Sequence, residues 1–233
     1  EADLSGQQFA VYRVGHEASP EYPDLRIPLL GDHQLENACT AVAAIEVLRE
    51  QGIDIAPEAV AQGLAQVQWA GRLEIMGRRP LVVVDGAHNA YSAQRLVEAL
   101  REHLTYRRLL LVFGASATHN PKDQLAILLP AADRAYITRS QHTKATPIAE
   151  LQQMVQELGY QTTPVNTVKE ALQQALEEAN EDDLVLVTGS LFVVAEAREA
   201  WFGLQGLPLP PSDPPGVYDV PTPAPRSVPS PRL

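Results

Sequence analysis

The sequence from Arg72 onward predicts an α/β fold: a Rossmann-like, mostly parallel sheet with helices on both faces. Short apolar runs rich in β-branched residues alternate with amphipathic stretches of helical length, which is the pattern of strand–helix–strand units. The runs are apolar at every position, as expected where helices cover both faces of a sheet. Small and polar residues follow the runs, at the edge where open α/β sheets bind their ligands.

Residues 71–203 are therefore expected to form one domain. Its predicted strands are Leu81–Val84, Leu109–Phe113, Ala135–Thr138, Leu184–Val187 and a weaker one near Thr162–Val165. Its predicted helices are Ser92–His103, Asp123–Leu129, Ile148–Leu158, Val168–Ala179 and Phe192–Trp201. The region contains no internal repeat, which favours a single sheet over a repeat architecture.

Residues 1–70 follow a different pattern. Two short strands are expected at Phe9–Val14 and Leu25–Leu30, followed by helices at Leu35–Arg49 and Pro57–Val67. The helix at Leu35–Arg49 is apolar on nearly all sides, which calls for burial on nearly all sides. Few elements of this chain could cover it. We therefore interpret residues 1–70 as the remnant of a larger domain.

The chain ends in a Pro-rich segment, residues 204–233. Ten of the 19 prolines lie in residues 208–233, and this stretch has no apolar periodicity. It is expected to be extended or disordered, because it cannot bury enough surface to offset the entropy of ordering. The first residue is Glu1 rather than a methionine. We expect the chain to be a processed product or a piece of a longer protein.

Composition excludes several classes of function. Lys and Arg number 18 against 29 Asp and Glu, a net charge of −11, which argues against binding to a nucleic-acid backbone. No apolar run approaches the roughly 20 residues of a membrane span, and nothing resembles a secretory signal. We expect a monomeric, cytoplasmic protein. The single cysteine, Cys39, excludes an internal disulfide and is expected to be a small buried side chain.

Chemistry-bearing residues gather after four of the predicted strands. The four segments are Asp85-Gly86-Ala87-His88-Asn89, Gly114-Ala115-Ser116, Arg139-Ser140-Gln141-His142 and Thr188-Gly189-Ser190. Glycines let a ligand approach the backbone, and helix N-termini attract anions. This edge is expected to hold something small, polar and anionic. The sequence lacks the phosphate-loop, dinucleotide-loop and nucleophile-elbow motifs, and also metal-ligand spacings. Residue chemistry alone therefore does not name the ligand.

Four motifs occur in a fixed order along the chain. They are Gly31-Asp32-His33-Gln34-Leu35-Glu36-Asn37-Ala38, Trp69-Ala70-Gly71-Arg72-Leu73-Glu74, Asp85-Gly86-Ala87-His88-Asn89 and Thr188-Gly189-Ser190-Leu191-Phe192. This set resembles the bifunctional folylpolyglutamate synthase/dihydrofolate synthase family of the Mur ligase superfamily. The resemblance covers about residues 20–203. It implies a Mur ligase C-terminal domain at 71–203, preceded at 1–70 by the end of the family's ATPase domain.

The resemblance implies an ATP-dependent ligase that adds glutamate to tetrahydrofolate polyglutamates or dihydropteroate through an acyl phosphate. By motif position, Asn37, Arg72 and Asp85 would contact ATP, and Arg72 would reach its phosphates. His88 and Ser190 would hold glutamate. The resemblance assigns no catalytic residue and no metal ligand to this chain. The phosphate loop and the Mg²⁺ ligands are expected in a missing N-terminal half, so the fragment alone is expected to be inactive.

The family pattern usually continues with Pro where this chain has Ala90, but Asn89 can still cap the following helix. The compact Asp-Lys-Asp that tends to follow Gly114 in the family is displaced here, so no role is carried over to Lys122 or Asp123.

Several alternatives stay open on the sequence alone. The chain could be a stand-alone, non-catalytic module that binds glutamate, folate or nucleotide, or a cyanophycin- or peptidoglycan-type Mur ligase. Asp85 could be only a turn residue, and Arg72 only a partner of Glu74. Asn37, in an apolar helix, could be satisfied by protein rather than ATP. Ser190 is also expected to cap the last helix.

Overall fold

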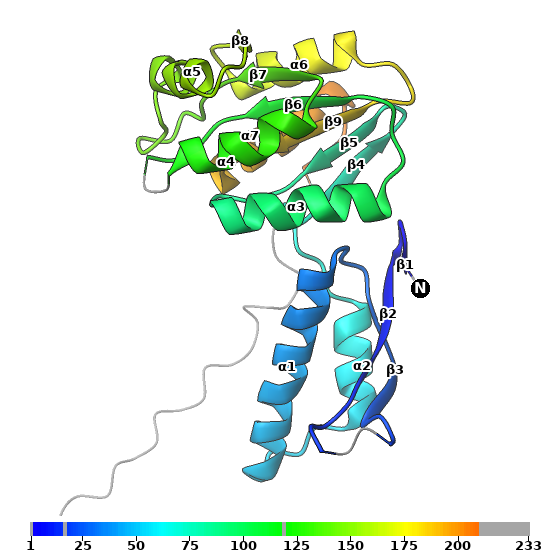
Figure 1. Cartoon of the computed structure of the whole chain (residues 1–233). Coiled ribbons are helices and arrows are strands. Elements are labelled where there is room, and N and C mark those ends of the chain that lie inside the picture. The colour runs from blue at the N-terminus through cyan, green and yellow to red at the C-terminus, as the bar shows by residue number, and fades with distance from the viewer. Residues whose placement is uncertain (1, 16–17, 118–119, 210–233) are drawn as a thin grey trace, which may run out of the picture.

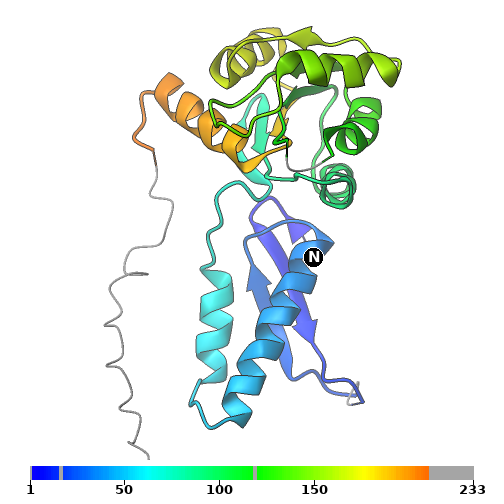
Figure 2. The same cartoon turned by 90° about the vertical axis from the view of Figure 1, so that its left-hand side faces the viewer.

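The computed structural model describes residues 2–15, 18–117 and 120–209, so most of the Pro-rich segment lies outside the described residues. Figure 1 shows two units that follow one another along the chain. The first is a three-stranded sheet with two helices, and the second is a six-stranded sheet flanked by helices. A segment from Gln66 to Leu73 connects them, as Figure 2 shows from a second direction.

The first unit is built on an antiparallel sheet in the order β1-β2-β3. Its strands are β1 (Ala2–Asp3), β2 (Gly6–Val11) and β3 (Tyr22–Ile27). The helices are α1 (Asp32–Glu50) and α2 (Pro57–Ala65). Both predicted strands exist, but each begins three residues earlier than expected. The core is small: Tyr22, Leu25, Val42 and Val60 are its buried members.

Much of α1 faces outward. Only Gln34, Ala38 and Val42 of this helix are buried, while Val47 and Leu48 are 51% and 39% exposed. The prediction that Cys39 is buried was wrong, because its thiol lies on the exposed side of α1. The neighbouring position, Ala38, takes the inward place instead. The first unit therefore carries an apolar helix face that the described residues leave open to solvent.

The second unit contains a sheet in the order β4-β5-β9-β6-β7-β8. The strands are β4 (Glu74–Arg78), β5 (Leu81–Val84), β6 (Leu109–Phe113), β7 (Arg134–Ile137), β8 (Thr163–Pro164) and β9 (Leu184–Thr188). All pairings are parallel except β4 with β5. The predicted α/β class and its five strands are confirmed. The antiparallel edge strand β4 was not predicted.

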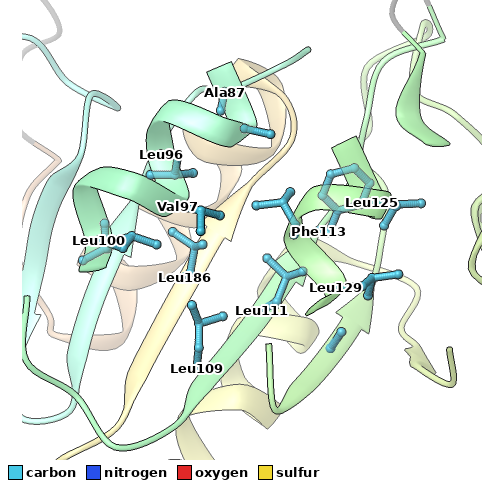
Figure 3. Packing of buried hydrophobic residues seen from close by; sticks show 14 of the residues in the cluster. Ala87, Leu96, Val97, Leu100, Leu109, Leu111, Phe113, Leu125, Leu129 and Leu186 are labelled. Carbon is cyan, nitrogen blue, oxygen red and sulfur yellow. The ribbon is translucent and has the colours of Figure 1, made fainter. Parts of the chain in front are cut away.

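Helices cover both faces of this sheet, as predicted. One face carries α3 (Ala90–His103), α4 (Pro121–Leu128) and α5 (Ile148–Glu157), with the short 3₁₀ helix Leu129–Ala131 after α4. The other face carries α6 (Val168–Glu178) and α7 (Leu191–Leu204). Leu109, Leu111 and Phe113 of β6 pack toward α3 and α4, as Figure 3 shows. Leu110 and Val112 pack on the opposite face. An alternating strand with two buried faces must be apolar throughout.

Among the described residues, none of the helices has the length and apolar character needed to cross a bilayer.

The amino ends of β6 and β9 are joined by a buried carboxylate. Asp183 has a fully buried side chain, and its Oδ2 accepts hydrogen bonds from Arg108 Nη2 at 2.7 Å and from the Asn180 N–H at 2.8 Å. The hydrogen bond from Arg108 holds the pKa of Asp183 well below its usual range. This ion pair fixes the strand ends opposite to the edge that carries the predicted site.

We expect Asp183→Asn to lower the free energy of unfolding by about 2 kcal/mol at pH 7, because a charge-assisted hydrogen bond is lost. The stabilisation by Asp183 is present above about pH 4, the ordinary pKa of an unfolded aspartate. It is lost as the pH falls below that value toward the depressed folded pKa. The difference between the two proteins should therefore shrink in acid. Urea unfolding at pH 7 and pH 3 measures this, with exposed Asp182→Asn as the matched control. A difference that is equal at both pH values would contradict the assignment.

Candidate functional site

The carboxylate of Asp85 lies at the carboxyl end of β5 and holds two backbone segments. Its side chain is buried, with the residue 7% exposed. The Leu73 N–H donates to Oδ2 and the Ala87 N–H donates to Oδ1, both at 2.8 Å. Leu73 has a φ of 42°, a strained value for a residue other than glycine. Asp85 thus fixes the end of the connecting segment against the sheet.

Burial raises the pKa of Asp85 above its ordinary value. The two backbone N–H groups oppose this shift, as do the nearby positive charges of Arg72 and, when protonated, His33. The N–H groups of Leu73 and Ala87 offset the free-energy cost of burying the carboxylate. The geometry of the loop therefore depends on the two acceptor oxygens of Asp85.

Glu74 fastens the same segment to helix α7. Its carboxylate accepts a hydrogen bond from the Gly71 N–H at 2.8 Å and two from Arg198 Nε at 2.8 and 3.1 Å. The Gly86 N–H donates to the Gly71 carbonyl at 2.8 Å. Gly71 has a φ of +73°, and a Cβ there would lie 2.9 Å from a methyl group of Val194. The alternative that Arg72 pairs with Glu74 is wrong: Arg198 takes that carboxylate.

Arg72 stands between these anchors, half-buried at the junction of the two units. A Cβ on Gly86 would lie 2.7 Å from Arg72 Nη1, so glycine allows the guanidinium to lie against the loop backbone. Arg72 is electrostatically coupled to Asp85 and His33. Within the part of the chain that the structure describes, its guanidinium makes no hydrogen bond or ion pair. Its donors are available for a ligand.

The first turn of α1 contributes a relay of polar side chains. Asn37 Nδ2 donates to Gln34 Oε1 at 3.1 Å, and Gln34 Nε2 lies 3.0 Å from His33 Nε2. Since the Gln34 oxygen is already an acceptor, its amide nitrogen donates to the ring. Burial lowers the pKa of His33, so the ring is neutral at pH 7 and able to accept. Asn37 is exposed, and its partner within the protein is Gln34, in line with the alternative that protein rather than ATP satisfies its amide.

His88 lies in the loop between β5 and α3. Its Nδ1 is 3.0 Å from the Gly86 carbonyl, which places the proton of a neutral ring on Nδ1. Gln124 Nε2 donates to the His88 carbonyl at 2.9 Å. Asn89 caps α3 in a reciprocal arrangement with Ser92, as predicted for this asparagine. The loop is therefore held at both ends.

These side chains meet in a cavity of about 170 Å³ between the first turn of α1, the connecting segment and the start of α3. Figure 1 shows α1 approaching α3 from the first unit. Four of the five predicted site residues line the cavity: Asn37, Arg72, Asp85 and His88. The cavity combines the unpaired guanidinium of Arg72 with amide and imidazole groups. Such a set suits a small anion with polar substituents.

Ser190, the fifth predicted residue, does not line this cavity. Its Oγ accepts from the Phe192 N–H at 3.2 Å, so the predicted cap of α7 is confirmed. It also lies 3.3 Å from Ser116 Oγ. The ring of Phe192 stacks on His142, with centroids 3.6 Å apart. Ser190 therefore belongs to a second polar cluster at the same carboxyl edge.

The structure adds residues that the sequence reasoning did not assign to the site. His33, Gln34, Tyr91 and Arg95 also line the cavity. His33 and Gln34 stand inside the first ordered motif, which was the available signal. Tyr91 and Arg95 are four positions apart on α3, a spacing that places them on one helix face. Their local sequence does not distinguish this helix face from an ordinary solvent-exposed face, so it could not be predicted to line a site.

Lys122 and Asp123 lie away from the cavity lining. Lys122 pairs with Glu157 at 2.8 Å, and Asp123 accepts from Asn120 at 2.8 Å. Among the described residues, no group of three or more His, Cys, Asp or Glu side chains is arranged to hold a metal ion.

We expect Asp85→Asn to destabilise the chain by about 2 kcal/mol, because an amide offers only one acceptor oxygen to two N–H donors. The amide protons of Leu73 and Ala87 should exchange faster with solvent. Urea unfolding and NMR hydrogen exchange measure the two effects. Exposed Asp54→Asn serves as control, since Asp54 makes no hydrogen bond in the described structure. Unchanged stability and exchange would show that Asp85 does not hold the segment.

Comparison with known proteins supports the resemblance seen in the motifs. Residues 71–191 match the family described as Mur ligase, glutamate ligase domain. A Halobacterium salinarum protein, whose name pairs folylpolyglutamate synthase with dihydropteroate synthase, is 43% identical over 75% of this chain and 21% of its own length. The dihydrofolate synthase/folylpolyglutamate synthase of Bacillus subtilis is 28% identical over 85% of this chain and 45% of its own length.

Solved structures give the same result. E. coli FolC in complex with ADP matches with a TM-score of 0.68 and 27% identity, over 81% of this chain and 44% of that one. The ADP complex of Mycobacterium tuberculosis folylpolyglutamate synthase matches with a TM-score of 0.71 and 27% identity, over 77% and 42%. The chain thus spans less than half the length of these relatives. It belongs to the Mur ligase family, with a glutamate ligase domain at residues 71–191, and its relatives are folylpolyglutamate and dihydrofolate synthases.

Proposed function

We propose that the chain is the C-terminal part of an ATP-dependent ligase that adds glutamate to a folate or to dihydropteroate. The observation that carries the proposal is the unpaired guanidinium of Arg72, fixed at the junction of two units in a cavity beside Asp85. Two further observations support the proposal. The relatives of this chain are named as synthases, and two structural neighbours were solved in complex with ADP.

In this proposal the cavity takes part of the nucleotide. Arg72 binds phosphate oxygens with its planar fork of donors, which remains charged at every physiological pH. Asn37 offers its side-chain oxygen, since its amide nitrogen already donates to Gln34. Asp85 uses both oxygens on backbone N–H groups, so its first contribution is to position Arg72. Any contact of Asp85 with the ribose or base uses the remaining lone pairs of the same two oxygens.

The proposed reaction has two steps. The carboxylate of the folate or pteroate attacks the γ-phosphorus of ATP, the bond to the bridging oxygen breaks, and ADP leaves. The amine of glutamate then attacks the carbonyl carbon of the acyl phosphate and the C–O bond breaks. The nitrogen loses a proton, which ends on the leaving phosphate, and an amide is formed. Arg72 stabilises the negative charge that shifts among the phosphate oxygens. Orientation of the two substrates supplies much of the remaining acceleration.

We assign the incoming glutamate to His88 and Ser190, at the carboxyl ends of β5 and β9. The Gly86 carbonyl fixes the ring of His88 through Nδ1. The Ser190 hydroxyl lies beside Ser116 at the start of α7, where the helix N-terminus favours a carboxylate. Gly114 and Gly189 keep this edge compact, because a Cβ on either would lie within 3 Å of neighbouring atoms.

The remainder of the ligase is proposed to pack on the exposed apolar face of α1. Val47 and Leu48 would be covered there, together with other exposed positions of that helix. The phosphate loop and the Mg²⁺ ligands are assigned to that remainder, as the family resemblance implies. We expect residues 1–233 alone to show no turnover.

We expect Arg72→Ala, introduced into the complete ligase, to lower kcat/KM for glutamate addition by about 100- to 1000-fold, as for the loss of a charged donor to the reacting phosphates. Arg72→Lys should recover only part of the activity, because an ammonium keeps the charge but loses the bidentate geometry. The measurement is ATP-dependent incorporation of glutamate into a folate and into dihydropteroate.

Arg101→Ala is the matched control, since Arg101 is an exposed arginine in the last turn of α3 and does not line the cavity. It should leave activity unchanged. Activity of Arg72→Ala within twofold of the parent would rule out the proposed role. Nucleotide binding by a complete protein that adds no glutamate would favour the alternative of a non-catalytic binding module.

A further inference from the structure

A larger cavity, of about 580 Å³, opens at the opposite edge of the six-stranded sheet. It lies at the amino ends of the strands, between the turn that joins β4 to β5, the segment after α3 and the segment before β9. Leu4 of the first unit closes one side. The four residues of β5 separate this edge from Asp85, a distance of roughly 13 Å along the strand. The two cavities are therefore distinct.

The lining of this cavity contains more positive than negative side chains, although the chain as a whole is negatively charged. Arg78, Arg79 and Arg107 line it, against two carboxylates, Glu181 and Asp182. The chain as a whole carries a net charge of −11. Arg79 is paired with Glu181 at 3.3 Å, and Arg107 Nε lies 3.4 Å from Asp183 Oδ1. The side chain of Arg78 makes no hydrogen bond or ion pair within the described residues. One guanidinium therefore remains for an anion.

Two further polar groups in the lining lack partners. The His103 side chain is only 5% exposed, and its Nε2 has no hydrogen-bond partner among the described residues. The nearest carboxylate oxygen, on Glu102, is 3.8 Å away and outside hydrogen-bond distance. The phenol of half-buried Tyr106 makes no hydrogen bond with the described residues. The imidazole nitrogen is inaccessible to solvent, so among these lining side chains the exposed guanidinium of Arg78 and the half-buried phenol of Tyr106 are the groups left to meet a ligand.

The rest of the lining is apolar. Leu4, Leu81 and Leu104 contribute hydrocarbon surface next to these donors. A cavity of this volume with an apolar wall and a few convergent polar groups is typical of a small-molecule site. The polar groups available here are the guanidinium of Arg78 and the phenol of Tyr106, and both can donate to an oxyanion.

We propose that this amino-edge cavity binds a small organic anion, with a phosphate or carboxylate held by Arg78 and Tyr106 and an apolar part against Leu81 and Leu104. Glu181 and Asp182 limit the total negative charge that the site accepts. The site is independent of the proposed ligase reaction, since its residues take no part in the cavity around Arg72.

The test uses the full 233-residue chain, labelled with ¹⁵N, and two probes that distinguish the anions: phenyl phosphate and benzoate. Benzyl alcohol serves as the uncharged control. We expect saturable shifts of the amide signals from His103 to Arg107 with at least one anion, and none with the alcohol. Arg78→Gln and Tyr106→Phe should each weaken binding at least fivefold. Neither side chain has a hydrogen bond or ion pair with the described residues to lose, so the amide spectra should otherwise match the parent.

Arg139→Gln is the charge-matched control, an exposed arginine at the carboxyl edge that should leave binding unchanged. The proposal is overturned if neither anion gives saturable shifts at the amino edge. It is also overturned if Arg78→Gln binds as tightly as the parent, or if the shifts are confined to the cavity around Arg72. Saturation by one anion and not the other supports the site and identifies its preferred head group.

Discussion

The buried carboxylate of Asp85 is the constraint on which the candidate site depends. It stands where β5 ends, and its two oxygens bind the N–H groups of Leu73 and Ala87. One of these residues ends the connection from the first unit, and the other belongs to the loop that leads into α3. Arg72 precedes Leu73, so the position of its guanidinium is set by this pair of hydrogen bonds and by the Glu74–Arg198 ion pair. Without them, a free arginine at a junction would lose far more side-chain and backbone entropy on binding an anion.

Much of this fold follows from local sequence, and the reasons are visible in single elements. The strand β6 is apolar at all five positions because both of its faces are buried, so periodicity and composition identify it. Asn89 and Ser190 are identified as caps because a short polar side chain precedes each helix. The edge strand β4 could not be predicted in this way. Its residues are only half-buried, and its pairing with β5 is a tertiary contact that its own composition does not encode.

The candidate site was predictable in its main residues and not in its shape. Ordered motifs pointed to Asn37, Arg72, Asp85 and His88, and these four share one cavity. Ser190 lies instead beside Ser116, because β9 and β5 are neighbours whose following loops turn to different helices. Arg95 lines the cavity only because α3 faces α1 across the junction of the two units. Neither segment specifies this arrangement on its own. The burial of Cys39 was predicted wrongly for a related reason: apolar residues lie on several sides of α1, but the described chain covers only one side of the helix.

We propose that this chain supplies one wall of a nucleotide site, and that the other wall belongs to a preceding part of the same protein. The most direct measurement is the mass of the natural gene product in its source cells. An immunoblot with an antibody to residues 72–203 would be run beside the recombinant chain, on lysates prepared with protease inhibitors. We expect a band at about twice the 25.4 kDa of this chain or more, because the chain spans less than half the length of its relatives. A single band that migrates with the recombinant chain would contradict it, because Arg72 would then have no second wall to face.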